Sequence, residues 1–260
     1  MYIFLIVVSF FSAFPFIWMI SAATNKSVDI IKGKMFFGTY FIENVKNLFA
    51  TVNVGRSFLN SLRNTLIGTL VSLIVCSMAG YGFQIYRDKN KDRLMSVLLL
   101  SMMVPFASVM IPLFKMFSIM SLLDTTLGFI LPSISTAFLI FFFRQSSMSF
   151  PYEIVQAARV DGMGEFGIYV KIYLPVMAPT LAAAAIVTFM NNWNSYLWPL
   201  IIMQSQESRT MPLLITGLTA GYTTDYGMLM LAVSVCTLPT VILFFTQQKR
   251  FVAGILGSVK

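Results

Sequence analysis

Few side chains in this sequence have the types and the spacing that chemistry requires. The 260 residues contain no histidine and only two cysteines, Cys76 and Cys236, each inside an apolar run. Catalytic zinc sites, histidine-activated nucleophiles and disulfide frameworks need residues that this sequence lacks. No Gly-x-x-x-x-Gly-Lys-[Ser/Thr] motif occurs that could cradle a nucleotide phosphate. We therefore expect no catalytic residue and no metal site in this chain.

The most informative polar stretch is residues 149–179, SFPYEIVQAARVDGMGEFGIYVKIYLPVMAP. Pro151 suits the first turn of a helix, and Glu153 places a negative charge near the positive end of the helix dipole. Asp161-Gly162 should end this helix, because glycine accepts the left-handed cap conformation. We expect the small Ala157 and Ala158 to leave a smooth exposed patch on it.

A second helical run, from Glu165 to Tyr173, should end at Leu174-Pro175. The stretch is then a hairpin of two short helices on the membrane surface, which suits a docking site. The alternative is an amphipathic hairpin that only packs against lipid headgroups.

A second group of polar side chains interrupts an apolar run at residues 191–196. Its amides and aromatic rings suit contact with a neutral hydroxylated solute, so we predict that it lines a translocation path together with Trp198. The alternative is that the amides only hold neighbouring helices together. The candidate path residues are Asn191, Asn192, Trp193, Asn194, Tyr196 and Trp198.

The elements that position these residues must lie in a membrane. Hydrophobic residues make up 57% of the chain and charged residues 11%, and the mean hydropathy is +0.80, whereas globular domains carry about 25% charged residues. Unbroken apolar runs favour helices over the alternating strands of a barrel. The gaps between charges predict six transmembrane helices, with kinks at several prolines, near 2–22, 62–84, 94–114, 125–145, 176–202 and 226–246.

The distribution of basic residues favours termini in the cytoplasm. Six spans place both termini on one side, which then holds ten of the 18 Lys and Arg residues, against eight on the other. The net charge of +8 is explained by these membrane-flanking residues and not by nucleic-acid binding. The first span begins at Met1 without a basic leader, so we interpret it as an uncleaved helix.

The 149–179 stretch resembles the cytoplasmic loop of the membrane subunits of bacterial ABC importers. That family carries Glu-Ala-Ala, then Asp-Gly three residues on, then Leu-Pro. Here the match is Gln156-Ala157-Ala158, Asp161-Gly162 and Leu174-Pro175. Gln156 stands where the family usually has Glu, which should alter an ionic contact without abolishing docking.

Further motifs narrow the resemblance to carbohydrate importers related to the smaller membrane subunit of the maltose transporter. The resemblance covers about residues 58–260 of one permease domain, 1–260. The motifs are Met103-Val104-Pro105-Phe106, Ile111-Pro112-Leu113, Trp193-Asn194, Leu197-Trp198-Pro199-Leu200, and the ending from Lys249-Arg250-Phe251-Val252-Ala253-Gly254 to Gly257-Ser258-Val259-Lys260.

The resemblance implies an all-α type I ABC importer transmembrane domain in the bacterial inner membrane, with a cytoplasmic coupling loop at 149–175. It implies that the protein is not an enzyme, and that ATP and Mg²⁺ bind two separate ATPase subunits. A second permease subunit, an extracytoplasmic solute-binding protein and a sugar would complete the system. The residues that it places at the ATPase are Glu153, Gln156, Ala157, Ala158, Asp161, Gly162, Leu174 and Pro175.

Two further segments have expected roles. Glycine spacing in the C-terminal KRFVAGILGSVK discourages a long helix, and the resemblance directs Phe251, Gly254 and Gly257 toward the ATPase. The 203–225 segment would face outward and meet the solute-binding protein, unless it is an ordinary solvated loop.

Other function classes fit the sequence less well. A proton-coupled transporter or channel should place Asp, Glu or His inside its spans, and the six predicted spans hold none. A membrane enzyme should show paired carboxylates or a nucleophile beside a base. An ABC permease for another solute, such as a glycerophosphate or a polyamine, stays open.

Overall fold

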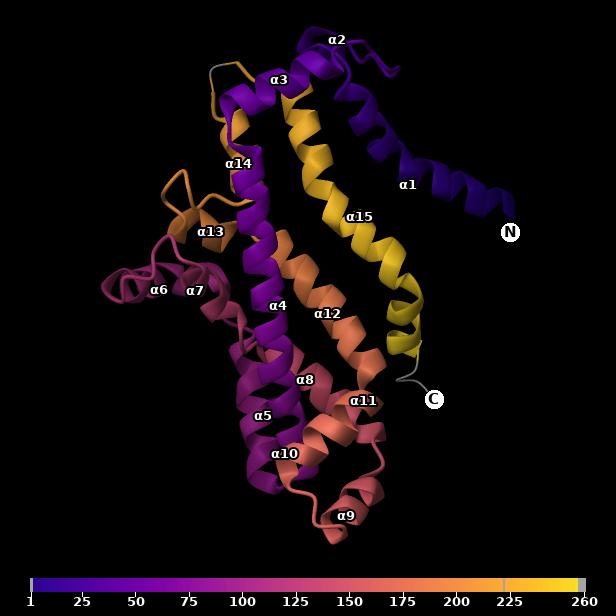
Figure 1. The fold of residues 1–260 in the computed structure, drawn as a ribbon, viewed down its shortest axis with the longest axis vertical. Coiled ribbons are helices and arrows are strands. Elements are labelled where there is room, and N and C mark those ends of the chain that lie inside the picture. Colours follow the sequence, from indigo (N-terminus) through magenta and orange to yellow (C-terminus); the bar gives the residue numbers. More distant parts are fainter. Residues whose placement is uncertain (1, 222, 257–260) are drawn as a thin grey trace. The chain divides into compact units, whose positions relative to one another are not determined.

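A computed structural model of the chain describes residues 2–221 and 223–256. Every regular element in these ranges is helical, which confirms the predicted all-α fold (Figure 1). In chain order the elements are α1 (Tyr2–Ala22), α2 (Ser27–Ile31), α3 (Phe41–Thr51), α4 (Val54–Ile85), α5 (Lys89–Ser101), α6 (Phe106–Ile119), α7 (Thr126–Ile130), η1 (Leu131–Ser133), α8 (Ala137–Ser146), η2 (Ser147–Ser149), α9 (Tyr152–Val160), α10 (Glu165–Ile168), η3 (Tyr169–Tyr173), α11 (Leu174–Val176), α12 (Ala178–Trp193), α13 (Leu197–Ile202), α14 (Met211–Thr219) and α15 (Tyr226–Leu256).

The chain forms two compact units. The first unit combines Met1–Ser61 with Gln204–Ile242, and the second unit combines Leu62–Met203 with Leu243–Lys260. The helices α4 and α15 each contribute residues to both units. The prediction of one permease domain over 1–260 stays a prediction.

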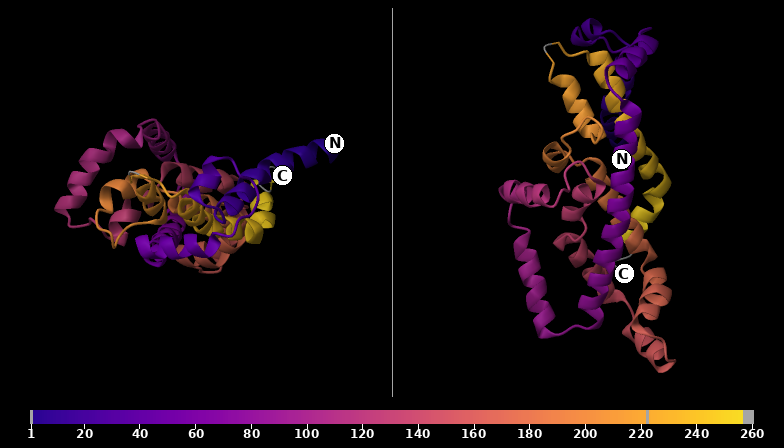
Figure 2. Two further views of the ribbon diagram at one scale, coloured as in Figure 1. Left: turned by 90° about the horizontal axis from the view of Figure 1, so that it is seen from above. Right: turned by 60° about the vertical axis from the view of Figure 1, so that its left-hand side comes forward.

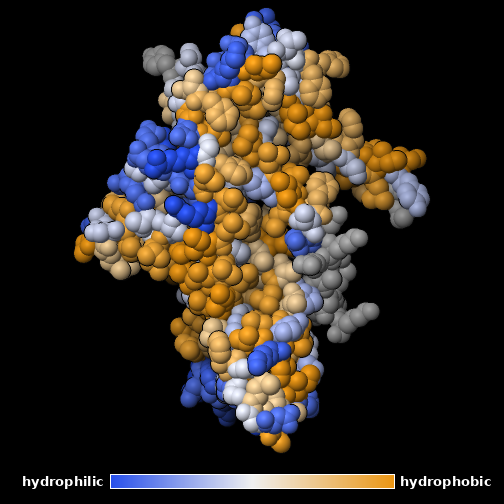
Figure 3. All heavy atoms as spheres, in the orientation of Figure 1, coloured by the Kyte–Doolittle hydropathy of each residue, from blue (hydrophilic) through white to orange (hydrophobic). Residues whose placement is uncertain are grey.

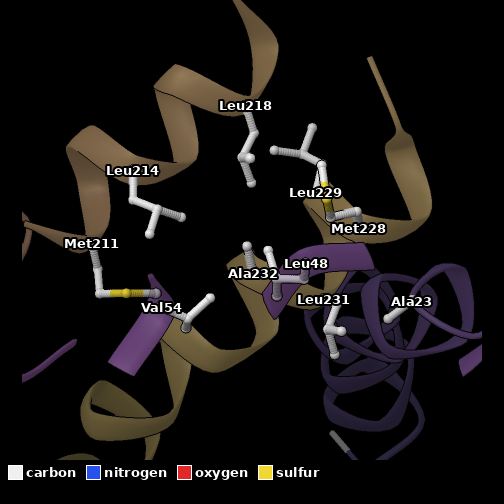
Figure 4. Close-up of a cluster of buried hydrophobic side chains, with 10 residues drawn as sticks. All are labelled: Ala23, Leu48, Val54, Met211, Leu214, Leu218, Met228, Leu229, Leu231 and Ala232. Atoms are coloured by element: carbon white, nitrogen blue, oxygen red, sulfur yellow. The ribbon is translucent and has the colours of Figure 1, made fainter. Parts of the chain in front are cut away.

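The first unit has an apolar core between α3, α4, α14 and α15 (Figure 4). Leu48, Met211 and Ala232 are fully buried in this core. The buried Asn44 on α3 donates from Nδ2 to the carbonyls of Ala23 at 2.9 Å and of Asn25 at 3.0 Å. These bonds satisfy backbone groups that would otherwise be costly to bury.

The second unit holds two further apolar clusters on α4. One joins the C-terminal end of α4 to α9 and to the helical run after it, and the other joins the middle of α4 to α5, α8 and α12. Gly80 lets α4 and α8 approach closely, because a Cβ atom there would lie 2.5 Å from Cβ of Phe143. Beside this crossing, the buried Arg144 on α8 pairs with Asp92 on α5.

Three helices among the described residues are long and apolar enough to cross a membrane: Tyr2–Ala22, Val54–Ile85 and Tyr226–Gln247. Three bent helix pairs also pass this test, so the count rises to six if each pair is one span. These are Lys89–Ser101 with Phe106–Ile119 (95°), Thr126–Ser133 with Ala137–Ser149 (53°), and Glu165–Val176 with Ala178–Trp193 (81°). The prediction of six spans rests on counting these pairs.

The bends correct the continuous helices predicted for three of the spans. Figure 2 shows α5 and α6 meeting nearly at a right angle, where 94–114 was expected to be one helix. Pro105 precedes α6 and accounts for this break, because proline lacks an amide hydrogen and disfavours helical geometry at the residue before it. The predicted span 176–202 is likewise two helices, because α12 ends at Trp193 and α13 begins at Leu197. The expectation of kinked helices is confirmed, and the bounds of the helices differ from those of the predicted spans.

Large apolar side chains cover much of the surface that a soluble protein would make polar. Figure 3 shows these side chains in orange over the visible face. On α1 they include Ile3, Phe4 and Phe11, with exposed fractions of 80%, 69% and 71%. Such exposure is expected where a helix meets lipid or another subunit.

Candidate functional sites

The first site is a hairpin in the second unit, formed by α9 and the helical run that begins with α10 (Figure 1). α9 follows Pro151 and ends at the cap residue Asp161. Gly162 has φ of +80°, and its amide donates to the Arg159 carbonyl at 3.1 Å. The Met163 amide donates to the Ala158 carbonyl at 2.9 Å. These bonds form a Schellman motif, which confirms the turn predicted at Asp161-Gly162.

Most of the residues predicted to meet an ATPase lie on the exposed surface of the hairpin. They are Glu153, Gln156, Ala157, Asp161, Gly162 and Pro175, whereas Leu174 is half-buried. Ala158 is 5% exposed and belongs to the apolar cluster beneath α9. The expected patch of two exposed alanines is therefore wrong for Ala158. Neighbouring residues on a helix point about 100° apart, so only one of the pair faces outward.

The second arm of the hairpin runs further than predicted. α10 continues through the π-helical turn η3, in which the Leu174 amide bonds to the Tyr169 carbonyl, and then into α11. The predicted end at Leu174-Pro175 is thus wrong, because the helical path reaches Val176. Pro175 lies in the first turn of α11, where a missing amide hydrogen costs little.

A polar network that the sequence analysis missed joins the two arms. Arg159 Nε donates to Glu165 Oε1 at 2.7 Å, and Arg159 Nη1 donates to the hydroxyl of Tyr152 at 3.2 Å. This hydrogen bond from Arg159 lowers the pKa of Glu165 below its ordinary value. Opposite charges on either side of a predicted turn were the signal that could have identified the pair.

The second site is a cavity of about 490 Å³ in the second unit. Four of the predicted path residues line it, namely Asn192, Asn194, Tyr196 and Trp198. Asn191 and Trp193 do not line it. Trp193 is 1% exposed, with its ring stacked on Phe189 at 6.0 Å between centroids. The other lining residues are Phe106, Phe129, Pro132, Ser133, Thr136, Ser195 and Leu197.

Two of the lining side chains are fixed by hydrogen bonds to distant elements. The Trp198 indole donates from Nε1 to the Gly128 carbonyl at 2.9 Å, and Phe117 packs edge-on against the indole at 5.2 Å. Asn192 Nδ2 donates to Thr69 Oγ1 on α4 at 3.5 Å. The lining residues that come from α6, α7 and η1 were not predicted, because only the tertiary fold brings them to residues 192–198.

The segment predicted to face outward, 203–225, contains α14 and belongs to the first unit from Gln204 on. Its start is tied to α4. Asn60 Nδ2 donates to the Glu207 carbonyl at 2.7 Å, and Arg56 Nε donates to the same carbonyl at 3.1 Å. The segment is thus partly a packed helix and not a simple solvated loop.

The C-terminal residues depart from the prediction in one respect. α15 continues through Phe251 and Gly254 to Leu256, so the glycine spacing does not end the helix. One internal glycine costs about 1 kcal/mol relative to alanine, which a long helix tolerates. Gly257 lies outside the described residues.

Within the described residues no group of three or more Cys, Asp or Glu side chains is arranged to hold a metal ion.

Comparison with known proteins decides the family. The family described as "Binding-protein-dependent transport system inner membrane component" matches residues 86–256. The chain belongs to this family. This membrane component is 48% identical to the lactose transport system permease protein LacG of Rhizobium radiobacter over 252 residues, which are 97% of this chain and 92% of LacG.

A second relative and a solved structure agree with this assignment. The arabinooligosaccharides transport system permease protein AraQ of Bacillus subtilis is 36% identical over 236 residues, with 90% of this chain and 82% of AraQ covered. A chain of a bacterial ABC transporter involved in the import of alginate has a TM-score of 0.82 at 19% identity, covering 96% of this chain and 94% of that one. The membrane component is therefore a multi-pass membrane protein with the fold of an ABC importer subunit.

Proposed function

We propose that this membrane component is the permease subunit that carries a sugar or oligosaccharide through a bacterial ABC importer. The observation that carries the proposal is the cavity at residues 192–198, whose lining combines aromatic rings, amides and hydroxyls and includes no charged residue. Neutral hydrogen-bonding groups beside aromatic surfaces suit an uncharged polyhydroxylated solute. The lactose and arabinooligosaccharide permeases among its relatives support this solute class.

A phosphorylated solute is the alternative that the relatives raise. An sn-glycerol-3-phosphate transport system permease protein, UgpE of Escherichia coli, is 29% identical over 258 residues. A phosphate group in a site of low dielectric needs Arg or Lys beside it. The uncharged cavity lining favours the sugar.

In this proposal the permease itself catalyses no reaction. ATP and Mg²⁺ bind two separate ATPase subunits, and α9 docks in a cleft of one of them in the cytoplasm. The exposed Glu153, Gln156, Ala157 and Asp161 make the contact, and Gly162 keeps the turn narrow. Closure of the ATPase pair then moves the membrane helices as rigid bodies between two states of access. Phe251, Gly254 and Gly257 extend toward the same interface.

The proposal also assigns a side of the membrane to each part of the chain and includes a second permease subunit. Both termini and the hairpin face the cytoplasm, and 203–225 faces the solute-binding protein on the other side. A second permease subunit completes the pathway, since one chain of six helices encloses little of it. Asn194 and Tyr196 meet the solute.

Reconstitution tests the proposed function. The tagged permease is purified from its native membrane in mild detergent with the subunits that accompany it, identified by mass spectrometry, and placed in vesicles. We expect ATP-dependent uptake of radiolabelled lactose or an arabinooligosaccharide that requires the solute-binding protein. Asn194→Ala and Tyr196→Phe should lower uptake of the sugar while ATPase subunits still co-purify. Uptake without ATP, or uptake of glycerol phosphate in place of sugars, would overturn the proposal.

A further inference from the structure

The hairpin is joined in sequence to α8 and α12, and it also makes polar contacts with α4, among them the 2.7 Å hydrogen bond between the hydroxyls of Ser77 and Tyr169. Glu165, which pairs with Arg159 across the hairpin, also accepts a hydrogen bond at Oε2 from the Tyr81 hydroxyl of α4 at 3.4 Å. The Arg159 guanidinium lies 5.6 Å from the ring centroid of Tyr86, directly after α4. Arg159 and Glu165 therefore connect both arms of the hairpin to the C-terminal end of one helix.

Apolar packing under this network fixes the same elements together. Val155 of α9 is fully buried in a cluster that includes Tyr81 and Ile85 of α4. The Tyr81 ring packs edge-on against Tyr173 at 4.8 Å and lies 5.6 Å from Tyr169. Tight packing transmits displacement because interiors are dense and compress little. The hairpin and this end of α4 should therefore move together.

The same helix contacts the cavity wall about three turns before Tyr81 in the chain. Thr69 of α4 accepts the hydrogen bond from Asn192, and Ser72 Oγ of α4 donates to the Ser133 carbonyl at 2.8 Å. Asn192 and Ser133 both line the cavity. A rigid helix thus carries contacts to the hairpin at one point and contacts to the cavity wall at another.

We propose that Arg159 and Glu165 are positioning residues that clamp the hairpin to α4, so that a displacement of the hairpin reaches the cavity through α4. This inference rests on the proposed function, because it concerns how that transporter couples ATP to transport. Neither residue belongs to the exposed face that we assign to ATPase contact. Their loss should therefore weaken transmission and not docking.

The test measures solute molecules transported per ATP hydrolysed in vesicles that hold the whole importer with its solute-binding protein. Arg159→Gln and Glu165→Gln should each lower this ratio by about fivefold or more, the range of a typical coupling energy, while ATP hydrolysis continues. Arg159→Lys should retain part of the ratio, because it keeps the charge and loses the planar fork. The double variant Arg159→Glu with Glu165→Arg should transport more solute per ATP than Arg159→Glu alone or Glu165→Arg alone.

Tyr81→Phe removes only the hydroxyl that reaches Glu165 and should lower the ratio with normal assembly. The matched control is Arg87→Gln, which breaks an exposed 3.5 Å ion pair with Asp92 without touching the hairpin; it should keep the wild-type ratio. Wild-type ratios in Arg159→Gln, Glu165→Gln and Tyr81→Phe would overturn the inference and leave the proposed function standing. Absence of ATP-driven sugar uptake by the wild type would instead overturn the proposed function.

Discussion

Replacing Gly162 with valine tests whether the hairpin turn needs its left-handed residue. Gly162 has φ of +80°, and a Cβ atom built there would meet no heavy atom within 4 Å. The cost of a side chain is therefore backbone strain and not collision. For L-residues the left-handed conformation costs about 1–2 kcal/mol, and a β-branched residue lies at the upper end.

Gly164 supplies a matched control two residues away. It also has open space around a built Cβ, but its φ of −71° and ψ of 156° are ordinary extended values for any residue. Gly164→Val should therefore cost only a few tenths of a kcal/mol. Gly162→Asn should fall between the two, because asparagine tolerates the left-handed region.

The assay follows solute uptake, ATP hydrolysis and thermal stability of purified importers that carry Gly162→Val, Gly162→Asn or Gly164→Val. A strain of about 1–2 kcal/mol lowers the population of the native turn about 5- to 30-fold relative to distorted turns. We expect Gly162→Val to insert normally and to lose most transport, with Gly164→Val close to wild type. Equal loss in both valine variants, or wild-type uptake by Gly162→Val, would refute the reasoning.

Three further predictions concern the stability of the protein and the recovery of the ATPase. Gly80→Ala should destabilise the protein by about 1–3 kcal/mol through overpacking at the α4–α8 crossing, whereas Gly82→Ala, with open space at its Cβ, should be neutral or stabilising; thermal melts in detergent compare the two. Ala158→Leu should destabilise by a similar amount because Ala158 is buried, while Ala157→Leu should keep the melting temperature and reduce recovery of the ATPase on purification. Trp198→Phe removes the indole hydrogen bond to the Gly128 carbonyl and should lower the free energy of unfolding by about 0.5–1.5 kcal/mol. Unchanged stability would show that this bond is unimportant.

Patterns of the chain predicted much of the functional hairpin. The proline before α9 and the Asp161-Gly162 stop depend on local backbone rules, so the bounds of α9 and the turn after it followed from the sequence. The burial of Ala158 did not, because it depends on which elements pack under α9. The link from Glu165 to Tyr81 spans 84 positions in the chain, and no local rule indicates such a contact.

The candidate path shows the same division. Four of its six predicted residues line the cavity, because amides and aromatic rings within an apolar run are conspicuous in a sequence. Trp193 does not line the cavity because of the direction in which this side of α12 faces. Phe106, Ser133 and Thr136 line the cavity because of the bends between the paired helices. Prolines predicted that helices would bend, but their angles depend on the neighbours against which each half packs.

The sequence by itself determined that this protein is an apolar, all-helical membrane component whose loop contains the Asp161-Gly162 turn. Composition and local backbone preference are enough for that, since the bilayer requires long apolar helices and the turn requires glycine. Only the tertiary structure decided that α4 joins the hairpin to the cavity wall. That arrangement depends on side-chain packing between segments distant in the chain, and a one-dimensional pattern carries no record of which faces meet.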